Sequence, residues 1–276
     1  MANITAAEVN SLRKKTGAGM MDCKKALVEA DGDIEKAVEI LRKKGQKVAA
    51  KRGDNEASEG LTVAMATEDA STGVIVTLNC ETDFVAKNAD FSDFAHQIAK
   101  VALDNGVKTV EELNELELDG LKVSEKITEQ IGKIGEKIEV SKLGNIAAET
   151  VVAYNHPGNQ IASLVGLSKT GDAVQGAGRD VAMQIAAMNP VAVNKESVPA
   201  DVVEKELEIA RDLIRQEGKP EEMVDKIANG KLNKFFKENT LLEQAFIKDN
   251  KKSVKQYLND TENGLTVTEY LRFSLS

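Results

Sequence analysis

The stretch of sequence around Phe84 limits the folds open to this chain more than any other. The apolar, β-branched run Val74–Leu78 predicts a strand. Thr82 and Asp83 follow it and can cap the unpaired N–H groups of a helical turn. Phe84 then lies in the first turn after a stiff strand, where its ring either packs on its own core or projects as an anchor for a partner. On this stretch alone packing is favoured, because an exposed aromatic ring needs a reason.

Composition narrows the class of protein. The 276 residues are 42% hydrophobic and 29% charged, which predicts a folded globular protein with one large domain or two to three small ones. Aromatic residues make up only 4%, with no Trp, so a base-stacking RNA-binding face is disfavoured. The net charge of -9 disfavours a phosphate-backbone binder and suits a protein partner. We therefore expect no direct contact with nucleic acid.

Cysteine usage and hydropathy indicate a compartment. Cys23 and Cys80 form no CxxC pair and have no zinc-ligand spacing, which is typical of free thiols in a reducing cytosol. The opening residues lack the pattern of a signal peptide, and no apolar run approaches the length of a membrane span. We expect a cytoplasmic protein that contacts no membrane.

The N-terminal part predicts three short helices. Thr5 and Glu8 form a capping box for the first, Asp22 can cap the second, and Asp33 can cap the third. The basic stretch 42–53 is interpreted as a linker that is helical in part, with a boundary near residue 55; a nucleic-acid patch is disfavoured there because no aromatic residues interleave it. We expect a helical bundle with its linker over residues 1–54.

Two methionines open the second of these helices. Adjacent residues on a helix do not share a face, so one of Met20 and Met21 should be buried and the other exposed and adaptable. Arg13 and Lys24 flank this end of the bundle. Charges on a small module are more often solvated than functional.

The middle of the chain alternates strand and helix patterns, which predicts an α+β core. Residues 94–99 resemble residues 181–186, and each follows a pair of strands, so we expect a duplicated strand-strand-helix unit. The two subdomains are predicted over 55–142 and 143–276. The predicted strands are 61–67, 73–79, 138–143, 146–154, 161–167 and 266–273, and the predicted helices are 90–102, 110–121, 123–134 and 181–188.

A helical hairpin is predicted inside the second subdomain, at about residues 199–239. Pro199 begins a helix at a favoured early position, and Val203, Leu207, Ala210 and Ile214 follow a heptad spacing. Gly and Pro turn the chain back after it. The hairpin either projects from the body or serves dimerisation, and the sequence leaves a homodimer and a heterotetramer with a partner both open.

Residues for covalent chemistry are scarce. His96 falls on the predicted helix that contains Phe94 and Ile98 and is interpreted as structural, while His156 lies in a turn without a nearby nucleophile motif. A thiol enzyme through Cys80 is supported by no local signature. Phosphate-binding glycine loops are incomplete. We expect no cofactor, no metal and no catalytic residue.

Two long motifs carry a family resemblance. The run Leu12–Leu27 (LRKKTGAGMMDCKKAL) and the run Asn79–Lys87 (NCETDFVAK) resemble the two signatures of bacterial elongation factor Ts. The resemblance implies a bundle like the ubiquitin-associated domain, a two-part core and a helical hairpin. It also implies nucleotide exchange on elongation factor Tu, in which the factor speeds GDP release so that GTP can rebind.

The resemblance implies roles for individual residues. Asp83 and Phe84 would enter the G domain of the partner, with the ring wedged between helices so that the magnesium and phosphate-binding region is disturbed, and Thr82 and Val85 would complete that loop. His156 would lie near a different domain of the partner. The other implied contacts are Arg13, Met20, Met21, Lys24, Ile134 and Gly135.

These implications reverse the expectation for Phe84. Exchange requires no acid-base residues, only a surface that prefers the nucleotide-free partner, and a stiff turn with one ring suits that task. We therefore expect an exposed ring. Some members carry a further helix after the last strand, which this sequence lacks, and part of the usual interface is in doubt for that reason. The alternative function is a non-catalytic adaptor or scaffold that binds a protein through the bundle and the hairpin.

Overall fold

The computed structural model describes residues 4–275 and has the predicted α+β class. It divides into two compact units. The first unit contains the chain up to Val63, Val76–Gly144 and the residues from Phe273 onward. The second contains Ala64–Ile75 and Asn145–Arg272. The predicted division at residues 54 and 142 stays a prediction.

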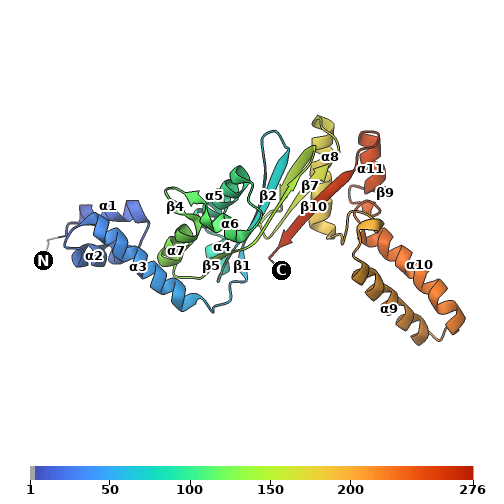
Figure 1. Ribbon diagram of the computed structural model, residues 1–276, viewed down its shortest axis with the longest axis horizontal. Helices are drawn as coiled ribbons and strands as arrows, with labels where there is room; N and C mark the ends of the chain where they lie inside the picture. The colour runs from blue at the N-terminus through green and yellow to red at the C-terminus, as the bar shows by residue number, and fades with distance from the viewer. Residues whose placement is uncertain (1–3, 276) are drawn as a thin grey trace. The chain divides into compact units, whose positions relative to one another are not determined.

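Three helices at the start of the first unit form the predicted bundle (Figure 1). They are α1 (Ala6–Thr16), α2 (Met20–Glu29) and α3 (Ile34–Arg52). Thr5 and Glu8 make the expected capping box, and Asp33 accepts hydrogen bonds from the N–H groups of Glu35 and Lys36. The small core consists of Val9, Leu12, Cys23, Ala26, Leu27, Ala30 and Ala37.

Two expectations for this region were wrong. Helix α2 begins at Met20 after Gly19, so Asp22 lies inside the first turn and caps nothing; its carboxylate instead pairs with Lys44 of α3. The basic stretch is not a linker, because α3 runs unbroken to Arg52. The residues of that stretch are good helix formers, and one side of α3 packs on a later helix of the same unit, which stabilises its extra turns.

The sheet of the first unit has the strand order β1-β2-β5. Strands β1 (Glu59–Ala66) and β2 (Thr72–Cys80) are the predicted hairpin, and the hydroxyls of Thr62 and Thr77 are 3.1 Å apart across it. Strand β5 (Ile138–Ala147) is one continuous strand, where two shorter ones were expected to divide near residue 144.

Among the later helices of the first unit, α6 is shorter than expected. Helices α4 (Asp83–Ala86) and α5 (Ala89–Asn105) follow β2, but α6 ends at Glu115 (Val110–Glu115), well short of residue 121. A small hairpin of β3 (Glu117–Leu118) and β4 (Leu121–Lys122) follows. Its turn is Asp119-Gly120, both with positive φ, and this dipeptide is a stronger hairpin signal than the helical pattern around it.

Helix α7 (Val123–Ile134) matches the predicted range and contains Gly132 in its last turn. This glycine faces Gly45 of α3: a Cβ on Gly132 would lie 2.8 Å from the Cα of Gly45. The missing side chains therefore allow the backbones of α3 and α7 to approach closely. Lys133 pairs with Asp90 at the start of α5, and its side chain lies beside Gly17 in the α1–α2 turn.

The second unit repeats the arrangement of the first. Its sheet has the order β10-β7-β6, with β6 (Thr150–Asn155) antiparallel to β7 (Ile161–Leu167) and β10 (Val267–Ser274) on the other side. Helix α8 (Asp172–Met188) follows the hairpin, as α5 follows β1 and β2. The expected strand-strand-helix repeat is present, although α8 begins nine residues before the predicted residue 181.

The remaining elements complete the second unit. Helix α8 packs on β6 and β7, and buried side chains from Val165 to Val267 form one core with it. Sequence patterns had not predicted η1 (Lys195–Ser197), β8 (Ala245–Phe246), β9 (Asp249–Ser253) or α11 (Val254–Thr261).

The predicted helical hairpin is present. Helices α9 (Ala200–Gln216) and α10 (Glu221–Asn239) lie side by side (Figure 1). The seam residues Ala210 and Ile214 are buried against Val224 and Ala228 of α10. Pro199 is the N-cap residue, one position earlier than expected.

Candidate functional site

The turn after β2 is a short, capped helix. Thr82 is its N-cap, with extended backbone angles, and its hydroxyl accepts from the N–H of Val85 at 3.5 Å. Within α4 the N–H of Ala86 donates to the carbonyl of Thr82 (3.2 Å). Asn88 then caps α5. The prediction that Thr82 caps this turn is confirmed.

The ring of Phe84 points away from the protein core. Its residue is 83% exposed, the largest exposed fraction among the exposed large apolar side chains of the described chain. Ala86 is the buried residue of α4, so the helix faces the core with a methyl group and presents the ring to solvent. The interpretation as a packed staple is therefore wrong, and the expected exposed ring is present. An exposed ring of this size indicates a binding function.

A carboxylate lies next to that ring. Lys87 donates to Asp83 at 2.6 Å, one helical turn apart. This hydrogen bond lowers the pKa of Asp83. The carboxylate therefore stays ionised at neutral pH, and it forms an ion pair with Lys87 beside the exposed ring.

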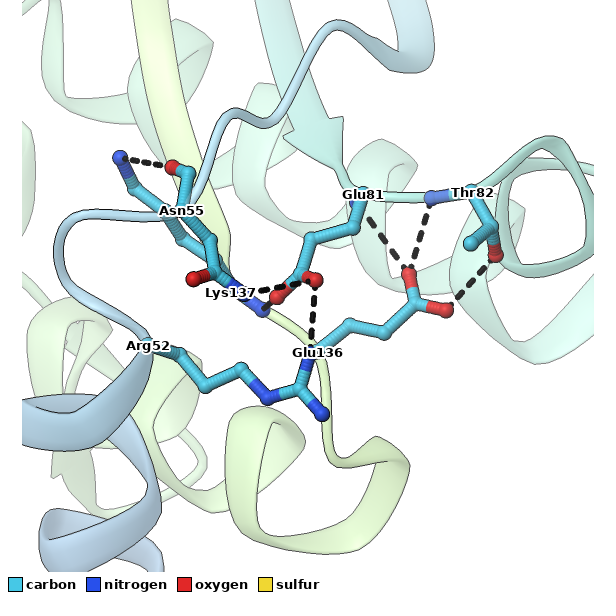
Figure 2. A network of polar contacts seen from close by, with 6 residues as sticks. All are labelled: Arg52, Asn55, Glu81, Thr82, Glu136 and Lys137. Atoms are coloured by element: carbon cyan, nitrogen blue, oxygen red, sulfur yellow. Dashed lines mark hydrogen bonds and ion pairs between the residues drawn. The ribbon is translucent and has the colours of Figure 1, made fainter.

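The carboxylate of Glu136 accepts hydrogen bonds from the residues that begin the turn (Figure 2). One of its carboxylate oxygens accepts from the N–H groups of Glu81 (3.2 Å) and Thr82 (3.0 Å). The other accepts from the hydroxyl of Thr82 at 2.7 Å. The chain between β2 and α4 is thus bonded through its backbone to the segment between α7 and β5.

Glu81 makes the reverse connection. Its carboxylate accepts from the N–H of Lys137, from Arg52 (2.7 Å) and from Asn55 (3.0 Å). The bond from the Lys137 N–H is the main reason that the pKa of Glu81 is lowered. We call Arg52, Asn55, Glu81, Thr82, Glu136 and Lys137 the reciprocal clasp, and Figure 2 shows the hydrogen bonds and ion pairs that join them.

Cys80 lies under the same turn and is not suited to nucleophilic chemistry. Its residue has no exposed surface, and its Sγ donates to the carbonyl of Thr82 at 3.2 Å. Burial, followed by the charge of Glu136, raises the pKa of the thiol to about 12. The thiol is therefore protonated at neutral pH, and this weakens the hypothesis of a thiol enzyme.

The residues expected to bind a partner from the bundle lie on its surface. Arg13 and Lys24 are exposed. Met20 and Met21 are 55% and 61% exposed, so the expectation that one of them is buried was wrong. They occupy the first turn of α2, ahead of Cys23, which is the first residue of that helix to reach the core.

Two other predicted residues adjoin the turn. Ile134 ends α7 and Gly135 caps it with φ 86°, and both are half-buried directly before Glu136. The first unit therefore brings together the Phe84 turn, the end of α7 and, through Lys133, the α1–α2 turn of the bundle.

The histidines lie elsewhere. His156 belongs to the second unit, is exposed in the β6–β7 turn, and its Nδ1 is 3.1 Å from the hydroxyl of Tyr154. His96 is exposed on α5, where its Nδ1 lies 2.8 Å from the carbonyl of Ser92, and its interpretation as structural stays a prediction. Among residues 4–275, no group of three or more His, Cys, Asp or Glu side chains is arranged to hold a metal ion.

Comparison with known proteins identifies the family. A family model described as "Elongation factor TS" matches residues 81–276. The chain belongs to the elongation factor Ts family. Proteins named Elongation factor Ts match it over nearly its whole length: 56% identity in Christiangramia forsetii, covering 100% of both chains; 54% in Amoebophilus asiaticus, covering 98% of both; and 47% in Porphyromonas gingivalis, covering 99% of this chain and 98% of the relative.

Membership of the elongation factor Ts family indicates the function. The family provides the nucleotide exchange factor for elongation factor Tu in translation elongation, so elongation factor Tu is the partner of this chain. No helix among the described residues is both long enough and apolar enough to span a membrane.

The residues that sequence reasoning missed are the members of the clasp other than Thr82. Glu81 lies inside the second signature run, and Glu136 follows Gly135 directly. No role was predicted for either residue. The one available signal was a single acidic residue in or beside each of two segments that the sequence analysis had singled out. Such a signal is too common to predict a contact.

Proposed function

We propose that Phe84 is the group that enters elongation factor Tu and speeds GDP release by disturbing its magnesium and phosphate-binding site. The observation that carries the proposal is an 83% exposed ring on a turn whose backbone is bonded to a second segment. A group that must displace parts of a partner has to be both projecting and stiff. A mobile ring would have to be ordered on binding, and the conformational entropy lost in ordering it would weaken the interaction with the partner.

The mechanism needs no bond to be made or broken in this chain. The factor binds nucleotide-free elongation factor Tu more tightly than the GDP form, and by linkage GDP weakens the factor's binding by the same ratio. Asp83, Thr82 and Val85 complete the inserted turn. Asp83 stays ionised and is held by Lys87, so the inserted turn presents a paired carboxylate beside the ring.

The other surfaces supply affinity. Met20 and Met21 offer adaptable apolar area on the bundle, with Arg13 and Lys24 beside them. Ile134 and Gly135 extend the contact next to the turn, and the exposed His156 touches another domain of the partner. We place this activity in the cytoplasm, without direct binding to nucleic acid or to a membrane.

Release of a fluorescent GDP analogue from purified elongation factor Tu tests the proposal. Phe84→Ala is expected to lower the stimulated rate by about 30-fold, because losing a central aromatic anchor costs about 2 kcal/mol or more. Ile247→Ala is the matched control: it removes an apolar side chain that is also exposed, at 44%, but lies in the second unit outside the proposed contacts.

Two results would contradict the proposal. A Phe84→Ala protein with undiminished stimulation removes the ring from the mechanism. A wild-type protein that binds elongation factor Tu without changing GDP release favours the adaptor function instead.

A further inference from the structure

The geometry points to Glu136 as the positioning residue for the Phe84 turn: its carboxylate fixes the turn in the orientation that exchange requires, without touching the partner. This inference rests on the proposed function of Phe84. Glu136 lies outside the set of contacts expected from the family resemblance. Its place in the clasp is visible only in three dimensions.

The contacts are of the kind that fix a backbone. Glu136 accepts from two successive main-chain N–H groups, those of Glu81 and Thr82, and from the hydroxyl of Thr82. Hydrogen bonds to a carboxylate are about twice as strong as neutral ones. The three hydrogen bonds that Glu136 accepts fix both the position and the orientation of the backbone where it leaves β2. Phe84 follows two residues later, inside a single helical turn that inherits this rotation.

The segment that contains Glu136 is itself held in place by hydrogen bonds. The neighbouring N–H of Lys137 donates to Glu81, and the ammonium of Lys137 donates to the carbonyl of Asn55 at 3.2 Å. Arg52 at the end of α3 donates to the same Glu81 carboxylate, whose side chain is only 14% exposed. The segment after α7, the end of β2 and the end of α3 therefore hold one another, and the turn cannot tilt without breaking several of these bonds.

The alternative reading of Glu136 is a contribution to stability alone. The two readings differ in what they predict. A stabilising residue changes unfolding and leaves the exchange reaction of the folded protein intact. A positioning residue changes the maximal rate of GDP release in folded protein and acts only through Phe84.

The test uses the full chain with Glu136→Ala and Glu136→Gln. The alanine variant removes all three acceptors, and the maximal rate of stimulated GDP release is expected to fall about tenfold or more, because a displacement of about 1 Å at a reacting group has effects of this size. Half-saturation should stay within about twofold, since docking through the bundle is unchanged. Glutamine keeps one oxygen for the two N–H groups and can donate its amide to Thr82, so it should restore most of the rate.

Hydrogen exchange of the amides of Glu81 and Thr82 gives a readout that does not depend on elongation factor Tu. Both amides should lose protection in Glu136→Ala and keep it in Glu136→Gln. Glu139→Ala is the matched control, because Glu139 is three residues further along the same segment, its side chain is 45% exposed, and it forms an ion pair with Lys137 but accepts no hydrogen bond from Glu81 or Thr82. If Glu136→Ala fails to fold, Glu136→Asp replaces it, since its carboxylate is drawn back by one methylene from the same donors.

A double mutant separates this inference from the proposed function. In a Phe84→Ala background, Glu136→Ala should cost less than about twofold more, because the residue acts through a ring that is no longer there. Loss of exchange in Phe84→Ala together with full exchange in Glu136→Ala overturns the inference and leaves the proposed function standing. Full exchange in Phe84→Ala overturns the proposed function, and the inference with it. Independent, additive losses also overturn the inference.

Discussion

One hydroxyl shows how much a single residue does at this site. The Oγ1 of Thr82 donates to Glu136 and accepts from the N–H of Val85, so the same atom joins α4 to a segment distant in sequence and begins the helix. The capping half of this role is local, and the sequence predicted it. The other half was not predicted, because Glu136 is 54 residues away and nothing in its neighbourhood marks it as an acceptor.

The buried thiol beneath this turn leads to a prediction for the two cysteines. Cys23 and Cys80 are both free and buried, and burial raises the pKa of Cys80 to about 12. The thiolate fraction of Cys80 at about pH 8 is then on the order of one in ten thousand. Neither cysteine should react quickly with a chromogenic disulfide reagent in the native protein, and both should react in denaturant. Rapid reaction of one thiol in the native protein would contradict this account.

At the scale of elements, the contact between α3 and α7 explains why the bundle belongs to the first unit. Gly45 and Gly132 meet backbone to backbone, and ion pairs such as Arg42–Glu129 border the contact. The sequence indicated three helices for the bundle because their caps and glycine breaks are local signals. It did not indicate this contact, because Gly45 and Gly132 are far apart in sequence and glycine has a low helix propensity. Tertiary packing overrides that local preference.

A pair of glycine substitutions tests the contact. Gly132→Ala places a Cβ 2.8 Å from the backbone of Gly45 and should destabilise the protein by about 1–3 kcal/mol. Gly230→Ala, inside α10 with nothing within 4 Å of its added Cβ, should stabilise the hairpin by about 0.5–1 kcal/mol. Urea unfolding followed by circular dichroism measures both. A Gly132→Ala protein as stable as the wild type would show that α3 does not depend on this close approach.

On the scale of the whole molecule, carboxyl groups with a lowered pKa are found in both units. Each is an acceptor in a cap, a turn or an ion pair, and hydrogen bonds to the ionised form lower its pKa. The positions could be guessed only where the acceptor was a cap close in sequence. The groups are Glu8, Asp33, Asp69, Glu81, Asp83 and Glu221.

The sign of the pH dependence follows from these shifts. A carboxyl whose folded pKa is depressed contributes stability above its unfolded pKa, and that contribution is lost as the pH falls through the folded pKa. The ordinary values are 4.5 for Glu and 3.8 for Asp, so the melting temperature should be steady near neutral pH and fall below about pH 4.5. Glu81→Gln should make that fall shallower. A melting temperature that rises on acidification would contradict the assignment.

Glu136 accepts hydrogen bonds from two main-chain N–H groups, those of Glu81 and Thr82. The position of the turn therefore does not depend on which side chain stands at residue 84. Exposed side chains on residues 83–86 can be changed while the hydrogen bonds between Glu136 and the preceding backbone remain. A chain with a different side chain at position 84 would then still present it at the same angle.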